Sequence, residues 1–351
     1  MTARPHDCTT LKDEQSSIQA GEQSKKIKLA KFAGFCYGVK RAVETAKKLK
    51  CENPDKNVFV LGELIHNAHV IAELENLGIK TLTEIPEKGE GICVIRSHGE
   101  SPQVIEKIQN AGFEIVDLTC PDVKKVQQKA VELAKEDYFV VIVGKSEHPE
   151  VVAIRANAEL WSKNVVVAVS PEQLKQYEQQ IKTHKKVGVV VQTTQRISTL
   201  NAIVEYLTSI AKEIHIANTI CQSTSMRQSE ARELAKTSDL VIVVGSKKSA
   251  NTTHLAEILK DITQTIHIEN ADELESYKDI IENSKEISIT AGASTPQDVI
   301  DEVMKNDCLT ARPHDCTTLK DKQSSSQAGE QSKIKTNERK NKNDKNIRKH
   351  G

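Results

Sequence analysis

The sequence predicts an α/β protein built from three related units, each with a parallel sheet covered by helices. Two observations support this fold class. First, short apolar runs alternate with amphipathic helical stretches between residues 26 and 306, and uninterrupted apolar runs are typical of strands that are buried on both faces. Second, three cysteines and the polar residues that follow them recur with related spacings. We therefore expect the three units to surround a pseudo-threefold axis.

The composition limits the class of protein. The chain has 351 residues, which is long enough for two or three compact units. Its formal net charge of +0 and its aromatic content of 3% argue against a protein that binds nucleic acid through overall charge or stacked bases. No apolar run approaches a membrane span, and the first 25 residues are unlike a signal peptide. We expect a cytoplasmic protein with no membrane partner.

The two ends of the chain carry the same segment. Thr2–Lys12 reads TARPHDCTTLK, and the same letters recur at Thr310–Lys320. Both copies are polar and lack periodicity, and the tail after residue 334 is rich in Lys and Asn, so we expect disordered extensions. Cys8 and Cys316 are copies of one another. A paired disulfide or metal role for them is a less favoured alternative, and a weak nucleic-acid role for the basic tail stays open.

Six apolar runs are predicted to form buried strands. In chain order they are VFVLGE (58–63), GICVIRSHG (91–99), FVVIVGK (139–145), VGVVVQTT (187–194), LVIVVGSK (240–247) and ISITAGAS (287–294). Each run contains Gly, Ser, Thr or His close to its carboxyl end. Ligands of open α/β sheets gather at the carboxyl ends of the strands, and the reactive side chains of this chain are concentrated there.

The expected units follow one another along the chain. The first strand, about residues 26–37, could also pack with the third unit. The expected division is an N-terminal extension at 1–25, α/β domains at 26–120, 121–217 and 218–306, and a basic tail at 307–351.

Three cysteines recur in phase with the polar strand ends. The second and third sets share the offsets +28 and +73 from their cysteine, and the first set has a shorter final segment. The sets are Cys36 with His66 and His98, Cys120 with His148 and Thr193, and Cys221 with Ser249 and Ser294. If the units surround one axis, three thiolates meet at one point, ringed by His, Thr and Ser.

The repeated cysteines favour a metal site over three core thiols. Cys36, Cys120 and Cys221 each lie at an element junction, with glycine, proline or hydroxyl neighbours. Three thiolates without a fourth suit an iron–sulfur cluster with one iron left open. A zinc site is less favoured, because zinc usually draws on a closely spaced ligand pair and no C-x-x-C occurs.

Other candidate residues are assigned no role in a site. Cys93 lies inside an apolar strand and is expected to be a core residue. Cys51 and Cys308 fall in polar surroundings at segment ends. Glu147 and His184 are expected to be ordinary polar residues.

Nine motifs, taken together and in order, resemble one known family. They are AGFCYGVKRAVE (33–44), GELIHN (62–67), RSHG (96–99), DLTCP (117–121), EHPEV (147–151), QTT (192–194), TIC (219–221), GSKKSANT (245–252) and TAGAST (290–295). With them, the chain from about Lys26 to Asn306 resembles the 4-hydroxy-3-methylbut-2-enyl diphosphate reductase family. Any one motif alone would be weak, but nine in the same order are specific.

The resemblance implies a fold, a cofactor and an activity. The family has three α/β domains around a central [4Fe–4S] cluster and catalyses the last step of the methylerythritol phosphate route to isoprenoids. Its allylic diphosphate substrate loses a hydroxyl group and gives isopentenyl and dimethylallyl diphosphates. The electron donor would be an external carrier such as ferredoxin or flavodoxin, because the chain has no G-x-G-x-x-G fingerprint of its own.

Carried over by position, the resemblance also assigns residues to roles. Cys36, Cys120 and Cys221 match the cluster ligands, and Glu150 and Thr193 match the proton-delivery pair. The residues that match the substrate pocket are His66, His98, His148, Thr193, Ser249, Ala250, Asn251 and Ser294. Because Ala250 has no polar side chain, any contact there would come from its backbone N–H.

Two other functions account for fewer of the candidate residues. A non-catalytic iron–sulfur sensor or electron carrier would need the three cysteines, but it has no use for Glu150, Thr193 and a ring of diphosphate ligands. A nucleic-acid binder rests only on the basic tail at 334–351. The reductase is therefore the favoured interpretation.

Overall fold

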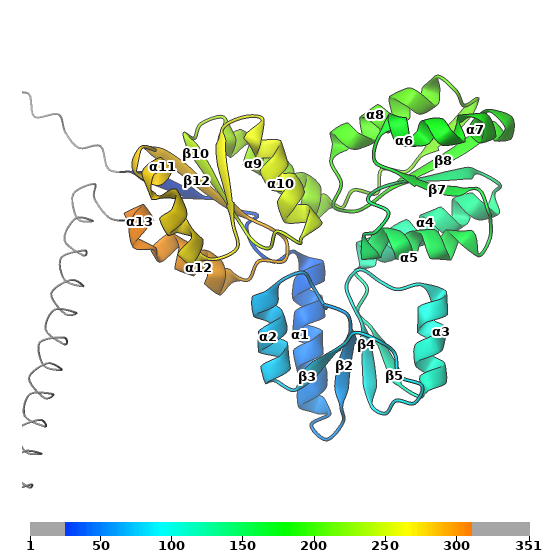
Figure 1. Ribbon diagram of the computed structural model, residues 1–351, viewed down its shortest axis with the longest axis horizontal. Coiled ribbons are helices and arrows are strands. Elements are labelled where there is room, and N and C mark those ends of the chain that lie inside the picture. Colours follow the sequence, from blue (N-terminus) through cyan, green and yellow to red (C-terminus); the bar gives the residue numbers. More distant parts are fainter. Residues whose placement is uncertain (1–24, 311–351) are drawn as a thin grey trace, which may run out of the picture.

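The computed structural model describes residues 25–310 and contains three sheets of four strands each. Every paired strand runs parallel to its neighbour. The predicted fold of three parallel α/β units is confirmed, and Figure 1 shows the units as three lobes that meet at one centre. The duplicated end segments, with Cys8 and Cys316, lie outside the described residues except at Thr310.

The first unit has a sheet in the order β3-β2-β4-β5. Its elements are α1 (Tyr37–Glu52), β2 (Val58–Leu61), α2 (Ala68–Asn76), β3 (Ile79–Leu82), β4 (Ile92–Ile95), α3 (Pro102–Ala111) and β5 (Glu114–Asp117). Apolar residues of α1 and α2 pack on one face of the central strands, and those of α3 pack on the other. Cys93, in β4, is fully buried, which confirms its prediction as a core residue, and Cys51 is exposed.

The second unit repeats this order as β7-β6-β8-β9. Its elements are α4 (Pro121–Lys135), β6 (Phe139–Val143), α5 (Pro149–Glu159), β7 (Val165–Ala168), α6 (Pro171–Leu174), η1 (Lys175–Tyr177), α7 (Glu178–His184), β8 (Lys186–Val191), α8 (Ile197–Thr208) and β9 (Glu213–Ile216). The five residues of β6 are all buried, because α4 and α5 cover one face of the sheet and α6 to α8 cover the other.

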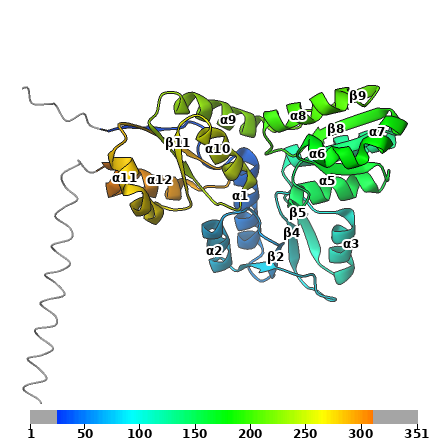
Figure 2. The ribbon, with the colours of Figure 1, turned by 45° about the horizontal axis from the view of Figure 1, so that its top comes forward.

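The third unit has the order β1-β12-β10-β11. Its elements are β1 (Lys26–Leu29), α9 (Gln222–Ala235), β10 (Leu240–Val244), α10 (Ala250–Lys260), β11 (Gln264–Ile268), η2 (Ala271–Tyr277), α11 (Lys278–Glu282), β12 (Glu286–Ala291), α12 (Gln297–Lys305) and α13 (Asp307–Thr310). Although β1 begins the described chain, it pairs with β12 in this unit. Figure 2 shows the blue β1 strand there, apart from α1.

Each cysteine of the repeat lies at a junction between two units. An outer strand of one sheet precedes it, and the first helix of the next unit begins directly after it. The junctions are β1–Cys36–α1, β5–Cys120–α4 and β9–Cys221–α9. The chain therefore passes from one unit to the next through a cysteine, which explains why the cysteines recur in phase with the strands.

The folded part continues beyond residue 306, where the sequence predicted the tail to begin. Helix α13 ends at Thr310, and Leu309 is 1% exposed in the core of the third unit. Cys308, expected in polar surroundings, packs against the same core. Leu309 is a single apolar residue among mostly polar neighbours, which gives no periodic pattern. Its burial could therefore not be predicted from the sequence. Among residues 25–310, no helix is long and apolar enough to span a bilayer.

Candidate active site

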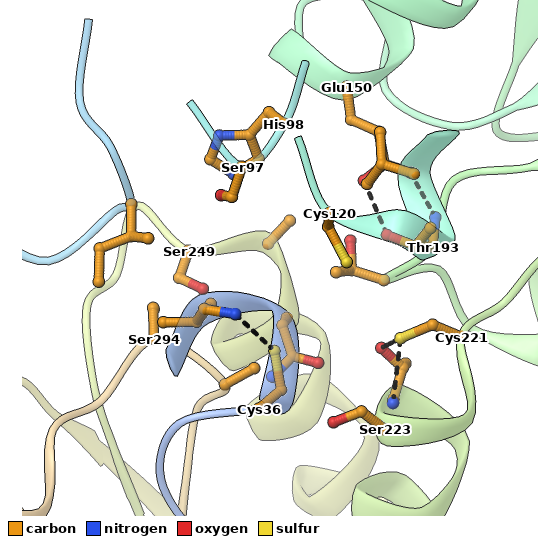
Figure 3. Close-up of a pocket in the computed structure, with 18 of the residues that line it drawn as sticks. Cys36, Ser97, His98, Cys120, Glu150, Thr193, Cys221, Ser223, Ser249 and Ser294 are labelled. Carbon is orange, nitrogen blue, oxygen red and sulfur yellow. Dashed lines mark hydrogen bonds between the residues drawn. The ribbon is translucent and has the colours of Figure 1, made fainter. Parts of the chain in front are cut away.

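A cavity lies where the three units meet, and Figure 3 shows side chains entering it from several sides. Every residue that the sequence assigned to the site lines this cavity. These residues are Cys36, His66, His98, Cys120, His148, Glu150, Thr193, Cys221, Ser249, Ala250, Asn251 and Ser294. Because they come from all three units, the cavity depends on the assembly of the units.

The three cysteines occupy the N-cap positions of α1, α4 and α9. The sulfur of Cys36 accepts a hydrogen bond from the backbone N–H of Val39 at 3.5 Å, and that of Cys221 accepts one from Thr224 at 3.4 Å. A helix N-terminus carries a partial positive charge, which favours the thiolate form of a cysteine. The sequence thus places three thiols at positions that suit metal ligands.

The thiols lie so close together that their charges interact. A Cβ atom at Gly38 would be 2.6 Å from the sulfur of Cys120 and 4.0 Å from that of Cys36, so glycine is needed for this approach. Burial raises the pKa of Cys120 and of Cys221, and the charge on Cys36 raises both further. Three thiolates are therefore unfavourable without a cation among them. The donor set fits an iron–sulfur cluster.

Three imidazoles line another part of the cavity. The nitrogens of His66, His98 and His148 approach within 4.8 Å of one another, and Nδ1 of His98 is buried without a partner among the described residues. Burial, followed by repulsion from His66, lowers the pKa of His98 well below its usual value and that of His148 to about 4. His98 and His148 are thus neutral at pH 7, and imidazoles can bind either a metal ion or an anion.

The neighbouring groups favour an anion. Ser249, Asn251 and Ser294 are buried, and Nδ2 of Asn251 has no partner within the described part of the chain. Helices α5 and α10 begin at the cavity, with His148 and Ser249 as their N-cap residues. Hydroxyl groups, an amide and two helix N-termini together offer donors to a phosphate group.

A buried carboxyl group lies beside these donors. Glu150 is 1% exposed and accepts two hydrogen bonds from Thr193, one from its backbone N–H at 2.7 Å and one from its hydroxyl at 2.8 Å. Burial raises the pKa of Glu150 to about 7, although both bonds from Thr193 act in the opposite direction. Glu150 can therefore hold or release a proton near neutral pH.

Some residues that support the site were not predicted from the sequence. Oε2 of Glu63 lies 2.9 Å from Nδ1 of His66 and fixes the orientation of the ring, and the hydroxyl of Thr224 lies 3.2 Å from the sulfur of Cys221. Ser97 also lines the cavity. Capping rules could have found Thr224, because it stands three residues after an N-cap. No sequence pattern marks Glu63 as the partner of an imidazole.

The chain is similar to known proteins of one family. The family model described as LytB protein matches residues 27–306. A 4-hydroxy-3-methylbut-2-enyl diphosphate reductase of Geobacter sulfurreducens is 41% identical over 280 residues, which cover 80% of this chain and 95% of that protein. The enzyme of the same name from Pelobacter propionicus is 40% identical over 280 residues, which cover 80% and 96%.

Two solved structures resemble the fold. One is (E)-4-hydroxy-3-methyl-but-2-enyl diphosphate reductase, described as the terminal enzyme of the non-mevalonate pathway, with a TM-score of 0.60, 36% identity and coverage of 80% of this chain and 98% of that one. The other is the E-1-hydroxy-2-methyl-but-2-enyl-4-diphosphate reductase of Plasmodium falciparum, with a TM-score of 0.73, 26% identity and coverage of 83% and 89%. The chain therefore belongs to the LytB protein family.

Proposed function

We propose that this protein reductively removes the hydroxyl group of 4-hydroxy-3-methylbut-2-enyl diphosphate. The products are isopentenyl and dimethylallyl diphosphates, and the reaction is the last step of the methylerythritol phosphate pathway. The names of the relatives support this reductase over a non-catalytic sensor or electron carrier. The observation that carries the proposal is one cavity that combines three thiols, a set of anion-binding donors and a buried carboxyl group that can be protonated.

Cys36, Cys120 and Cys221 would hold one [4Fe–4S] cluster. Their thiolates would bind three of its irons and would leave one iron without a protein ligand. When bound, the cluster would supply electrons and a Lewis-acid site for the substrate hydroxyl group. The electrons would come from an external carrier such as ferredoxin or flavodoxin in the cytoplasm.

The imidazoles and the α10 N-terminus would bind the diphosphate. Burial and repulsion from neighbouring imidazoles lower the pKa values of His98 and His148. An incoming anion favours the charged form of an imidazole, so we expect these two side chains to gain protons when substrate binds. His66 would bind the anion beside them. Ser249, Asn251 and Ser294 would add neutral hydrogen bonds, and Ala250 its backbone N–H. Diphosphate binding would orient the hydroxyl end of the substrate toward the thiols.

Glu150 and Thr193 would deliver the proton that the departing hydroxyl group requires. A protonated Glu150 can donate to the hydroxyl oxygen of Thr193, which frees the hydrogen of that hydroxyl for the substrate. The substrate takes up two electrons and two protons and releases one water molecule. The raised pKa of Glu150 provides the protonated form near pH 7.

Product analysis tests this function. Protein reconstituted with iron and sulfide under anaerobic conditions is mixed with the substrate and a chemical reductant, which replaces the carrier protein. Both diphosphate products should form, and inorganic diphosphate should inhibit by competing with the substrate. A reconstituted protein that carries its full cluster and yields neither product would exclude the proposal.

A further inference from the structure

Residues 30–35 form a loop between β1 and Cys36, and this loop lies against α9. Glu230 of α9 holds the first half of the loop. Its two carboxylate oxygens accept the backbone N–H groups of Lys31 at 2.8 Å and of Phe32 at 2.9 Å. Two charge-assisted hydrogen bonds to one carboxylate fix the loop relative to the helix.

Arg227, one turn earlier on α9, holds the second half of the loop. Its guanidinium donates to the backbone oxygens of Phe32 and Gly34, the latter at 2.8 Å, and to that of Ala291, at the end of β12, at 2.7 Å. Arg227 is 3% exposed, so these bonds are buried. A planar guanidinium can reach three carbonyl groups only when loop, strand and helix adopt one arrangement.

These contacts connect two of the three cysteines. Helix α9 begins after Cys221, and the loop that α9 holds ends at Cys36. The backbone N–H of Cys36 also donates to the oxygen of Ala293, just beyond the strand end that Arg227 contacts. Helix α9 therefore follows one cysteine directly and holds the loop that leads to the other.

Arg227 is also a buried positive charge. Every hydrogen-bond partner that the structure gives to its guanidinium is a backbone oxygen. Burial lowers the pKa of Arg227 to about 10, so the side chain keeps its charge at neutral pH, and the charges on Cys36, Cys221 and Glu230 oppose this shift. A buried cation is unfavourable unless negative charge lies nearby. The carboxylate of Glu230 supplies such a charge, and the cysteine thiolates would add to it when they hold a cluster.

We propose that Arg227 and Glu230 form a positioning clamp that fixes Cys36 relative to Cys221 before the cluster binds, and that Arg227 offsets the negative charge of the thiolates and the cluster. The charge role rests on the proposed cluster, whereas the positioning role concerns the protein without it. A cation near the cluster stabilises the reduced form, which carries more negative charge. Arg227 therefore raises the reduction potential.

Hydrogen–deuterium exchange of the full-length, cluster-free protein tests the positioning role. Glu230→Gln leaves one acceptor oxygen for two N–H groups, so an amide at position 31 or 32 should exchange roughly fivefold faster, as expected for the loss of one hydrogen bond. The ammonium of Arg227→Lys is a single point and cannot span three carbonyl groups as the planar guanidinium does, so exchange at Cys36 should also accelerate. Arg232→Gln, on the same helix but outside the clamp, should exchange like wild type. Wild-type exchange of the loop in both clamp variants would overturn the positioning role.

The reduction potential of the reconstituted protein tests the charge role. Arg227→Gln should shift the potential to more negative values, Arg227→Lys should shift it less, and Arg232→Gln should leave it unchanged. Glu230→Gln removes a negative charge and should shift the potential in the positive direction. This variant provides a second measurement of the charge role if Arg227→Gln does not fold. Shifts of the same sign at Arg227 and Glu230 would overturn the charge role. Because exchange is measured without cofactor, a protein that never binds a cluster would refute the proposed function and leave the positioning role standing.

Discussion

Glu150 and Thr193 are joined by two hydrogen bonds although 43 residues separate them in the chain. One carboxylate oxygen accepts the backbone N–H of Thr193 and the other accepts its hydroxyl, so the carboxyl group has a single orientation. Burial at the same time makes its charged form costly, which raises the pKa to about 7. A fixed, buried and protonable carboxyl group is what a proton donor requires.

Replacing Glu150 by glutamine should slow turnover by about 10²–10⁴-fold, the usual loss for a general acid. Glutamine keeps the shape: its oxygen can accept the backbone N–H of Thr193 and its NH2 group can donate to the Thr193 hydroxyl oxygen. It carries no acidic proton, so turnover should fall while substrate affinity changes little. Single-turnover rates with a chemical reductant and calorimetric binding measure the two effects separately. Glu147→Gln, in the exposed segment just before α5, is the matched control and should behave like wild type. Turnover of Glu150→Gln at the wild-type rate would remove the proton donor from the mechanism.

The single-turnover rate should decrease as the pH rises above about 7. A proton donor is active in its protonated form, which predominates below its pKa, and burial raises the pKa of Glu150 to about 7. The rate should therefore be flat below this value and fall above it, and the residual rate of Glu150→Gln should lack this ionisation. A rate that increases through pH 7 would show that Glu150 acts as a base instead.

Loss of the His98 side chain should weaken binding more than chemistry. Its Nδ1 atom is buried without a partner in the described part of the chain, and a hydrogen bond to a charged group contributes about 1.5–3 kcal/mol. We expect His98→Ala to raise the dissociation constant of the substrate by roughly 10–100-fold. His215→Ala, exposed on β9, should have no effect. A fall in the single-turnover rate at unchanged affinity would contradict this role.

Helix α13 should contribute to stability through Leu309. The side chain is 1% exposed within the core of the third unit, and Leu→Ala changes in cores cost about 2–5 kcal/mol. Leu309→Ala should lower the free energy of unfolding in urea by an amount in this range. Leu77→Ala, at a position that is 45% exposed, should change it much less. Equal stability of both variants would show that α13 does not stabilise the third unit.

The sequence predicted the inner strands but not all of the outer ones, for a physical reason. All six predicted runs became inner strands, such as β6, whose residues are buried by helices on both faces and by strands on both sides. Outer strands such as β9 (Glu213–Ile216) keep exposed residues, with the burial pattern eiee, and they show no continuous apolar run. A continuous apolar run therefore predicts a strand that is buried on both faces, but it does not predict a strand that is only partly buried.

The sequence predicted those cavity residues that recur at the same spacing in different units. Cys120 and Cys221 stand at equivalent junctions, so the polar residues that line the cavity lie at the same offsets, +28 and +73, after each cysteine. The supporting residues have no such pattern, because their partners are distant in the chain. Arg227 contacts a carbonyl group 195 residues away, at Phe32. Contacts of this kind depend on how β1 joins the third unit, which no local sequence pattern records.

Cys36, Cys120 and Cys221 together should hold one [4Fe–4S] cluster, which the iron and acid-labile sulfide content of anaerobically reconstituted protein measures most directly. We expect about four irons and four sulfides per chain. Both should be lost when any of the three cysteines is changed to serine, and both should be retained in Cys93→Ser. Stable zinc without sulfide, or a full cluster in Cys120→Ser, would contradict this assignment.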